Sequence, residues 1–159
     1  MAAMQNLCID DGIIELNINN RGVLRFNPSD FNLYNRMAKF IKELPELEKK
    51  YHSEVELSRN EEKEEGSFGV VESGTDLAKA IDTEVKERLN SVFGLGADFD
   101  TFLGGVNCMG FGMNGERIIT NTLNAITPYL ENGVQKHMDD AAETAKLIRE
   151  KRRAMQSGT

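Results

Sequence analysis

The residues that could do chemistry begin with a glycine-rich string, Gly110-Phe111-Gly112-Met113-Asn114-Gly115, which matches the pattern GxGxxG. In dinucleotide-binding folds this pattern follows a buried parallel strand and opens a helix, and an acidic residue about 20 positions later binds the ribose. Here residues 104–109 make a poor buried strand, and the candidate acid Glu131 comes too early. The sequence therefore predicts no nucleotide or other cofactor site at this string.

Asp98 and Asp100 raise the possibility of a calcium-binding loop. An EF-hand loop needs oxygen ligands at its fifth and twelfth positions and glycine at its sixth. These positions hold Phe102, Met109 and Leu103, none of which fits. We predict instead that Asp98 caps a helix.

The remaining reactive side chains, Cys8, Cys108, His52 and His137, are scattered singly. None has the spacing of a metal-binding motif. A nucleophilic Cys108 would need a histidine and a third group brought beside it by the fold. We interpret both histidines as surface residues of charged helices. The sequence thus predicts no metal site and no catalytic residue, and the chain is not expected to be an enzyme.

Composition favours a cytoplasmic protein that binds other proteins. The 159 residues are 40% apolar and 28% charged, with a formal net charge of −7. Such a surface repels a phosphate backbone, so nucleic-acid binding is disfavoured. Two cysteines suit a reducing compartment. No secretory leader precedes Asp11, and no apolar run approaches the ~20 residues of a membrane span, so no membrane partner is expected.

The pattern of elements predicts an α+β fold that is mostly α, with an N-terminal β-hairpin packed on three to four helices. The pattern predicts two strands, over residues 13–18 and 23–26, on either side of an Asn/Gly turn. We expect the apolar face of these strands to cover the following helix. Asn27 and Pro28 read as the start of that helix, and Pro45 as its interruption. The expected apolar face is Phe31, Tyr34, Met37, Ile41 and Leu44.

The rest of the chain reads as an acidic flexible linker at about 59–73, a helix that ends at Phe93, a glycine-rich loop and a long last helix. Pro128 predicts a kink in that helix. We expect residues 1–135 to form one α-rich domain. Residues 136–159 are expected to project as a helix with a short tail.

Apolar residues in the glycine-rich loop allow two interpretations. They complete the core, or they remain exposed as a surface for a subunit or client. In the last helix, a narrow apolar stripe suits packing against another helix, and residues 146–153 carry five positive charges and one negative. The candidate partner-binding residues are Phe99, Phe102, Met109, Phe111, Met113, Ala141, Ala145, Ile148, Arg149 and Arg152.

Four segments carry a resemblance to a known family: residues 16–19 (LNIN), residues 24–30 (LRFNPSD), residues 89–96 (LNSVFGLG) and residues 102–107 (FLGGVN). Their order resembles that of the tail assembly chaperones of long-tailed phages and prophages of Gram-positive bacteria. The resemblance spans roughly residues 13–130, and its motifs are packing residues, with no catalytic signature.

The resemblance implies a non-enzymatic chaperone that multimerises on the helical tape measure protein and recruits tail tube protein before the tube polymerises. It implies no cofactor, and some family members also exist in a longer frameshifted form. Two alternatives stay open. One is another phage structural or adaptor protein that is retained in the virion. The other is a helical regulator that binds nucleic acid through its basic C-terminal helix.

Overall fold

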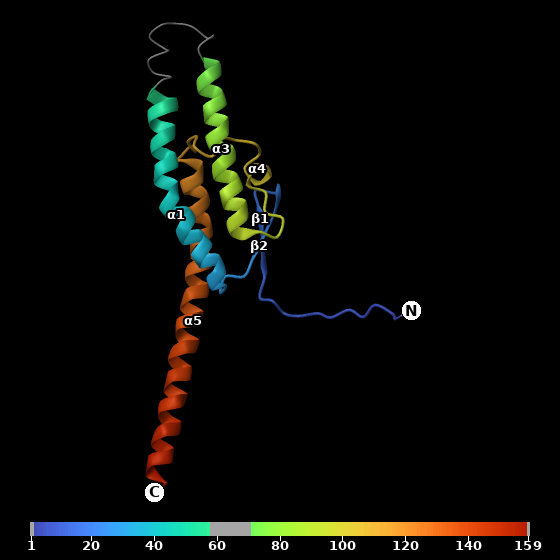
Figure 1. The fold of residues 1–159 in the computed structure, drawn as a ribbon, viewed down its shortest axis with the longest axis vertical. Coiled ribbons are helices and arrows are strands. Elements are labelled where there is room, and N and C mark those ends of the chain that lie inside the picture. The colour runs from blue at the N-terminus through green and yellow to red at the C-terminus, as the bar shows by residue number, and fades with distance from the viewer. Residues whose placement is uncertain (1, 58–70, 159) are drawn as a thin grey trace.

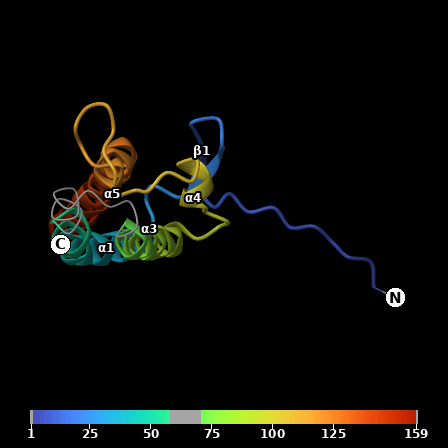
Figure 2. The same cartoon turned by 90° about the horizontal axis from the view of Figure 1, so that it is seen from above.

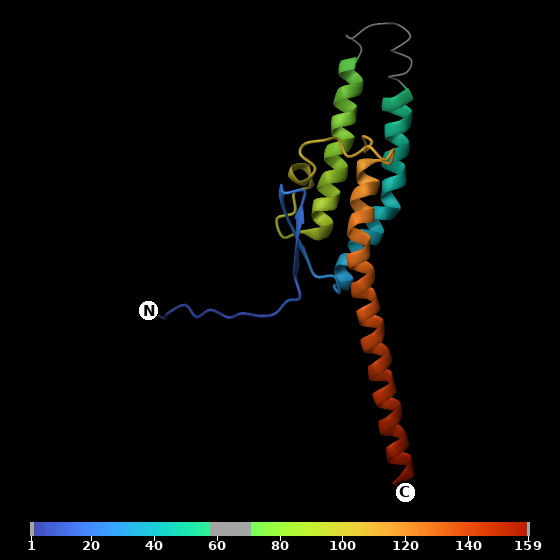
Figure 3. The same ribbon diagram turned by 180° about the vertical axis from the view of Figure 1, so that it is seen from behind.

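The computed structural model describes residues 2–57 and 71–158, which form the predicted α+β, mostly α fold (Figure 1). Figures 1 and 3 show the first half of α5 beside α1, while its second half continues alone. The predicted linker at 59–73 lies mostly outside the described residues, but its last three residues already belong to α3, so its end was wrong. The elements are β1 (Ile14–Ile18), β2 (Gly22–Phe26), α1 (Phe31–Tyr51), the π-helical turn η1 (His52–Glu56), α3 (Val71–Phe93), α4 (Phe99–Phe102) and α5 (Ile118–Ser157).

The hairpin forms as predicted, but it packs elsewhere. Strands β1 and β2 pair antiparallel, and both Asn19 and Asn20 have positive φ in the turn. The buried residue Phe26 packs edge-on against Phe93 at the end of α3, with ring centroids 5.3 Å apart. The expected cover was α1. Its apolar face is occupied by α3, so the hairpin packs mainly on α3 and α4, as Figure 2 also shows.

Helix α1 differs from the prediction at its start and at Pro45. Asp30 is the N-cap, and its carboxylate accepts from the Asn32 amide at 2.9 Å, whereas Asn27 caps the turn before it. The helix also continues through Pro45, which was predicted to interrupt it. Pro45 is exposed, so water can hydrate the carbonyl of Ile41 that a proline leaves without its helical donor.

The buried face of α1 is also rotated from the prediction. Phe31 and Ile41 are more than half exposed. The residues that face the core recur at alternating spacings of four and three. This spacing is typical of two helices whose axes are nearly aligned, and α1 and α3 run in opposite directions along them (Figure 1). The core-facing residues are Leu33, Met37, Phe40, Leu44, Leu47 and Tyr51. The predicted face of α3, which includes Ile81, Val85 and Leu89, is buried against them.

Helix α5 begins at Ile118, with Arg117 as its N-cap, and runs past Pro128 to Ser157 with a bend rather than a break. Its first half buries Ile119, Ile126 and Leu130 in the core. No helix in the described ranges, α5 included, is both long enough and apolar enough to span a membrane.

The first half of α5 is docked by a close backbone approach. The Tyr34 hydroxyl of α1 lies at hydrogen-bonding distance from the carbonyl oxygens of Pro28 and Leu130. One turn later, Gly133 lies so close to Pro28 that an added Cβ would stand 1.8 Å from the Pro28 carbonyl oxygen. Among the described residues of α5, Gly133 is the last one that is buried.

We predict that Gly133→Ala destabilises the fold by about 1–3 kcal/mol, because the methyl group must displace backbone atoms. Gly74→Ala is the matched control, since its Cβ would meet nothing within 4 Å in α3. There alanine should be neutral or stabilise by up to about 1 kcal/mol through its helix propensity. Denaturant melts measure both, and an equally stable Gly133→Ala variant would contradict the close approach.

Candidate protein-binding surface

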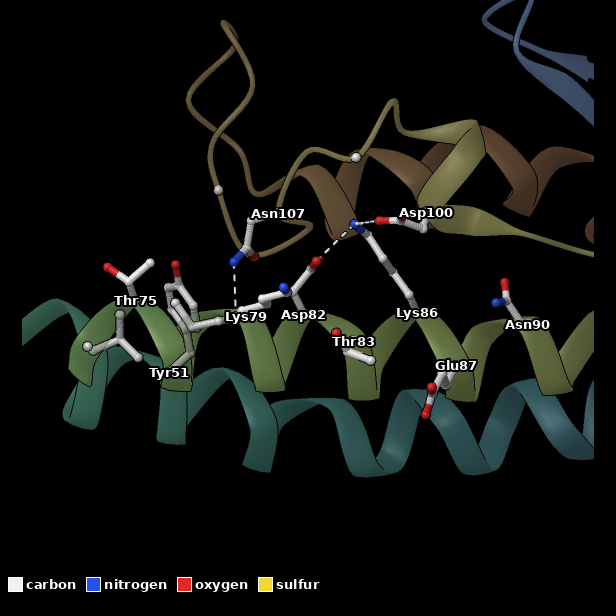
Figure 4. Close-up of a pocket in the computed structure, with 15 residues that line it drawn as sticks. Tyr51, Thr75, Lys79, Asp82, Thr83, Lys86, Glu87, Asn90, Asp100 and Asn107 are labelled. Carbon is white, nitrogen blue, oxygen red and sulfur yellow. Dashed lines mark hydrogen bonds and ion pairs between the residues drawn. The ribbon is translucent and has the colours of Figure 1, made fainter. Parts of the chain in front are cut away.

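The position of the glycine-rich loop is set by a buried lysine. Lys86 of α3 is only 3% exposed, and its ammonium donates to Asp82 at 2.9 Å, to Asp100 at 2.7 Å and to the Val106 carbonyl at 2.8 Å (Figure 4). All three ammonium protons are thus engaged. Because Asp100 and Val106 belong to α4 and the loop, one side chain ties both to α3.

The charge of this lysine is maintained by its partners. Burial alone would lower the pKa of Lys86, but its hydrogen bonds to the Asp100 and Asp82 carboxylates outweigh this effect and raise that pKa above its ordinary value. The second carboxylate oxygen of Asp82 accepts from the Cys108 amide at 2.8 Å. Burial raises the pKa of the Cys108 thiol, and the nearby Asp82 carboxylate raises that pKa further. This cysteine therefore stays protonated and is a poor nucleophile.

Asn107 completes the attachment of the loop. Its side-chain amide donates to the Ala78 carbonyl at 3.1 Å, and its side-chain oxygen accepts from the Met109 amide at 2.9 Å. Figure 4 shows the Asn107 side chain pointing to α3, beside the pocket that Thr75 and Lys79 line. The loop is therefore an ordered packing element along this stretch.

Three of the predicted partner-binding residues are core residues instead. Phe99, Phe102 and Met109 are each at most 3% exposed. The Phe99 ring packs between those of Phe93 at 5.7 Å and Phe102 at 5.2 Å. Their assignment to a binding surface was wrong, because the attachment of the loop to α3 places them in the core. Asp98 has the predicted role of a helix cap, and its hydrogen bonds with Thr101 lower the pKa of its carboxyl.

The tip of the loop, by contrast, exposes two apolar side chains. Phe111 is 61% exposed, and Met113 is fully exposed. Phe111 forms a β-bridge with Arg117, whose guanidinium lies 4.9 Å from the ring centroid. The same guanidinium donates to Glu56 at 2.9 Å and to the Met109 carbonyl. Phe111 is therefore an exposed ring on a rigid support.

Arg117 is a positioning residue that sequence reasoning missed. It joins the loop tip to η1, because its partner Glu56 is the last residue of η1. The Glu56 carboxylate also pairs with Nδ1 of His52 at 2.7 Å. Partial burial would raise the pKa of Glu56, but the hydrogen bonds from Arg117 and His52 outweigh it and lower that pKa. His52 itself is exposed, as expected, and the side chain of His137 lies outside the described residues.

The other predicted partner-binding residues lie on the second half of α5. Every described side chain from 135 to 158 is exposed. This projecting segment carries Ala141, Ala145, Ile148, Arg149 and Arg152. Met138 on this segment lies about 30 Å along α5 from Ile118 at 1.5 Å per residue. The structure thus places the remaining predicted residues on two exposed surfaces, one at the loop tip and one on the projecting segment.

Comparison with protein-family models, curated proteins and solved structures finds no match to this chain. Within residues 2–57 and 71–158, no three His, Cys, Asp or Glu side chains gather into a group that could hold a metal ion. The inference of function therefore rests on the two exposed surfaces and the residues that position them.

We predict that Lys86→Met destabilises the protein by about 3 kcal/mol, because Asp82 is left as a buried carboxylate without its partner. Amide exchange at residues 106–109 should accelerate, since their attachment to α3 is weakened. Lys79→Met, at an exposed position two turns earlier on the same face of α3, is the control and should have little effect. A loss below about 0.5 kcal/mol at position 86 would contradict the anchoring role.

Proposed function

We propose that this chain is a tail assembly chaperone of a long-tailed phage or prophage, acting in the cytoplasm of the host cell. In this proposal it multimerises on the tape measure protein and recruits tail tube protein. The observation that carries the proposal is the projecting segment of α5, which is exposed throughout its described side chains and carries an apolar stripe. A chain that presents such a helix beyond its own core is built to associate with other helices.

The loop tip is the proposed contact for the client. Phe111 and Met113 are the residue types that adapt to varied apolar surfaces, and Arg117 holds the first of them in place. Burial of client side chains against these groups supplies the binding energy, with no need for a cofactor. The net charge of −7 favours solubility of the loaded assembly.

The engagement of the polar groups supports a non-enzymatic role. The Lys86 ammonium is saturated by its three acceptors, and the Cys108 thiol is held protonated in the core. Asp98 is occupied as a helix cap. Asp98 and Cys108 are among the groups that the sequence offered for chemistry near the loop, and each has a structural task in the fold, as Lys86 does.

The direct test is co-expression with the tape measure protein encoded in the same phage. We predict that the intact chain keeps this client soluble and co-purifies with it. The double variant Phe111→Ser/Met113→Ser should lower the recovered client about tenfold, which corresponds to roughly 1.4 kcal/mol. Ile41→Ser removes an apolar side chain of α1 whose exposure, 51%, is close to the 61% of Phe111, and this variant should leave recovery unchanged.

Two outcomes would contradict the proposal. A folded chain that never co-purifies with the client is not its chaperone. A chain found in many copies in purified particles is a virion component, because a chaperone leaves as the tube polymerises. Binding to DNA with a steep dependence on salt, lost when Lys151, Arg152 and Arg153 are neutralised, would instead indicate the nucleic-acid alternative.

A further inference from the structure

The exposed stripe of the projecting segment has the spacing of a coiled-coil seam. Its members alternate at intervals of three and four residues, as positions a and d of a heptad do. Its three large apolar side chains, Met138, Ile148 and Met155, are 48–78% exposed, although methionine and isoleucine are usually buried in a protein core. We call the residues of this stripe the α5 seam: Met138, Ala141, Ala145, Ile148, Arg152 and Met155.

We propose that the α5 seam pairs with the same seam of a second copy of this chain, with the two helices antiparallel. The inference deepens the proposed function, which includes multimerisation, by naming the interface and its direction. It depends on three observations: the order of large and small residues, the length of the projecting segment, and the distribution of its charges.

The α5 seam is complementary to the same seam of a second copy that runs in the opposite direction. In an antiparallel pair centred between Ala145 and Ile148, each a position faces a d position of the other copy. Ala145 then faces Ile148, and Met138 faces Met155. Ala141 faces Arg152, so the long arginine stem packs over a small side chain while its charged end reaches water. Large residues face small ones in four of the six layers, which favours close packing.

The length of the projecting segment fits the same centre. Residue 158 of one copy would lie opposite residue 135 of the other. Residue 135 is exposed, whereas Gly133 is buried against Pro28. The antiparallel pair therefore covers the projecting segment and ends where each helix enters the body of its own chain.

The charges favour the antiparallel direction. Residues 146–153 carry five positive charges and one negative, while residues 136–143 carry one positive and three negative. Antiparallel pairing sets each basic end beside the acidic part of the other copy. Parallel pairing would set both basic ends together and would place two Arg152 side chains in one layer, where like charges repel.

Sedimentation of the full chain over a range of concentrations tests the pairing. We expect a monomer–dimer equilibrium that Ile148→Lys weakens at least about tenfold. Leu147→Lys is the matched control, because residue 147 has similar exposure (53% against 48%) but lies outside the α5 seam. Both sites are exposed, so neither variant threatens the fold, and the control should leave dimerisation unchanged.

Spin labels test the direction. Cys8→Ser removes the exposed cysteine, and Glu143→Cys or Ser157→Cys then adds one label per chain, since Cys108 is buried. An antiparallel pair separates the two labels along the axis by about 10 Å at position 143 and about 30 Å at position 157. A parallel pair would give the same separation at both positions.

A chain that stays monomeric at high concentration overturns the proposal, as does equal weakening by both lysine variants. Equal label separations overturn the antiparallel direction. If Ile148→Lys abolishes recovery of the tape measure protein but not dimerisation, the α5 seam binds the client instead. Since sedimentation uses this chain alone, failure of the dimer is distinguishable from failure of the chaperone function.

Discussion

The buried ammonium of Lys86 is the constraint on which the placement of the other parts depends. It holds Asp100 of α4 and the Val106 carbonyl against α3, while Asp82 holds the Cys108 amide. The Cys108 carbonyl in turn accepts from the Ile119 amide at 2.8 Å, in the first turn of α5. A single paired charge on α3 thus orients the loop, and through the loop it orients the start of the longest helix. Further along, α5 is held by its buried residues Ile126 and Leu130 and by its contacts near Tyr34 and Gly133.

This arrangement decides which apolar groups remain available to partners. The anchor draws the first part of the loop into the core, so Phe99 and Met109 are used for packing. The tip of the loop carries Phe111 and Met113 outside the core, and Arg117 supports Phe111 from the side. At the other end, Gly133 is the last buried residue described in α5, and every described side chain from 135 to 158 is exposed. The two exposed surfaces are therefore consequences of where the packing ends.

Local backbone chemistry was readable from the sequence, and long-range pairing was not. The Asn19-Asn20 turn, the Asp98 cap and the end of α3 at Phe93 depend on neighbouring residues and were predicted. The buried face of α1 was placed incorrectly at its edge. The predicted face that begins at Phe31 and the observed face that begins at Leu33 share Met37, and only packing against α3 selects between them. Burial of Lys86 was missed because its partner Asp100 lies 14 residues away, in the short helix α4, and lysine side chains are normally exposed.

The central claim is that the projecting segment of α5 is completed by another chain, and amide exchange along α5 at several protein concentrations tests it most directly. A helix without tertiary packing frays and exchanges quickly, whereas a paired helix is protected. The account predicts that residues 118–133 are protected at every concentration, and that residues 135–157 gain protection as the concentration rises. Protection of residues 135–157 that is absent at every concentration, or unchanged by dilution, would contradict it.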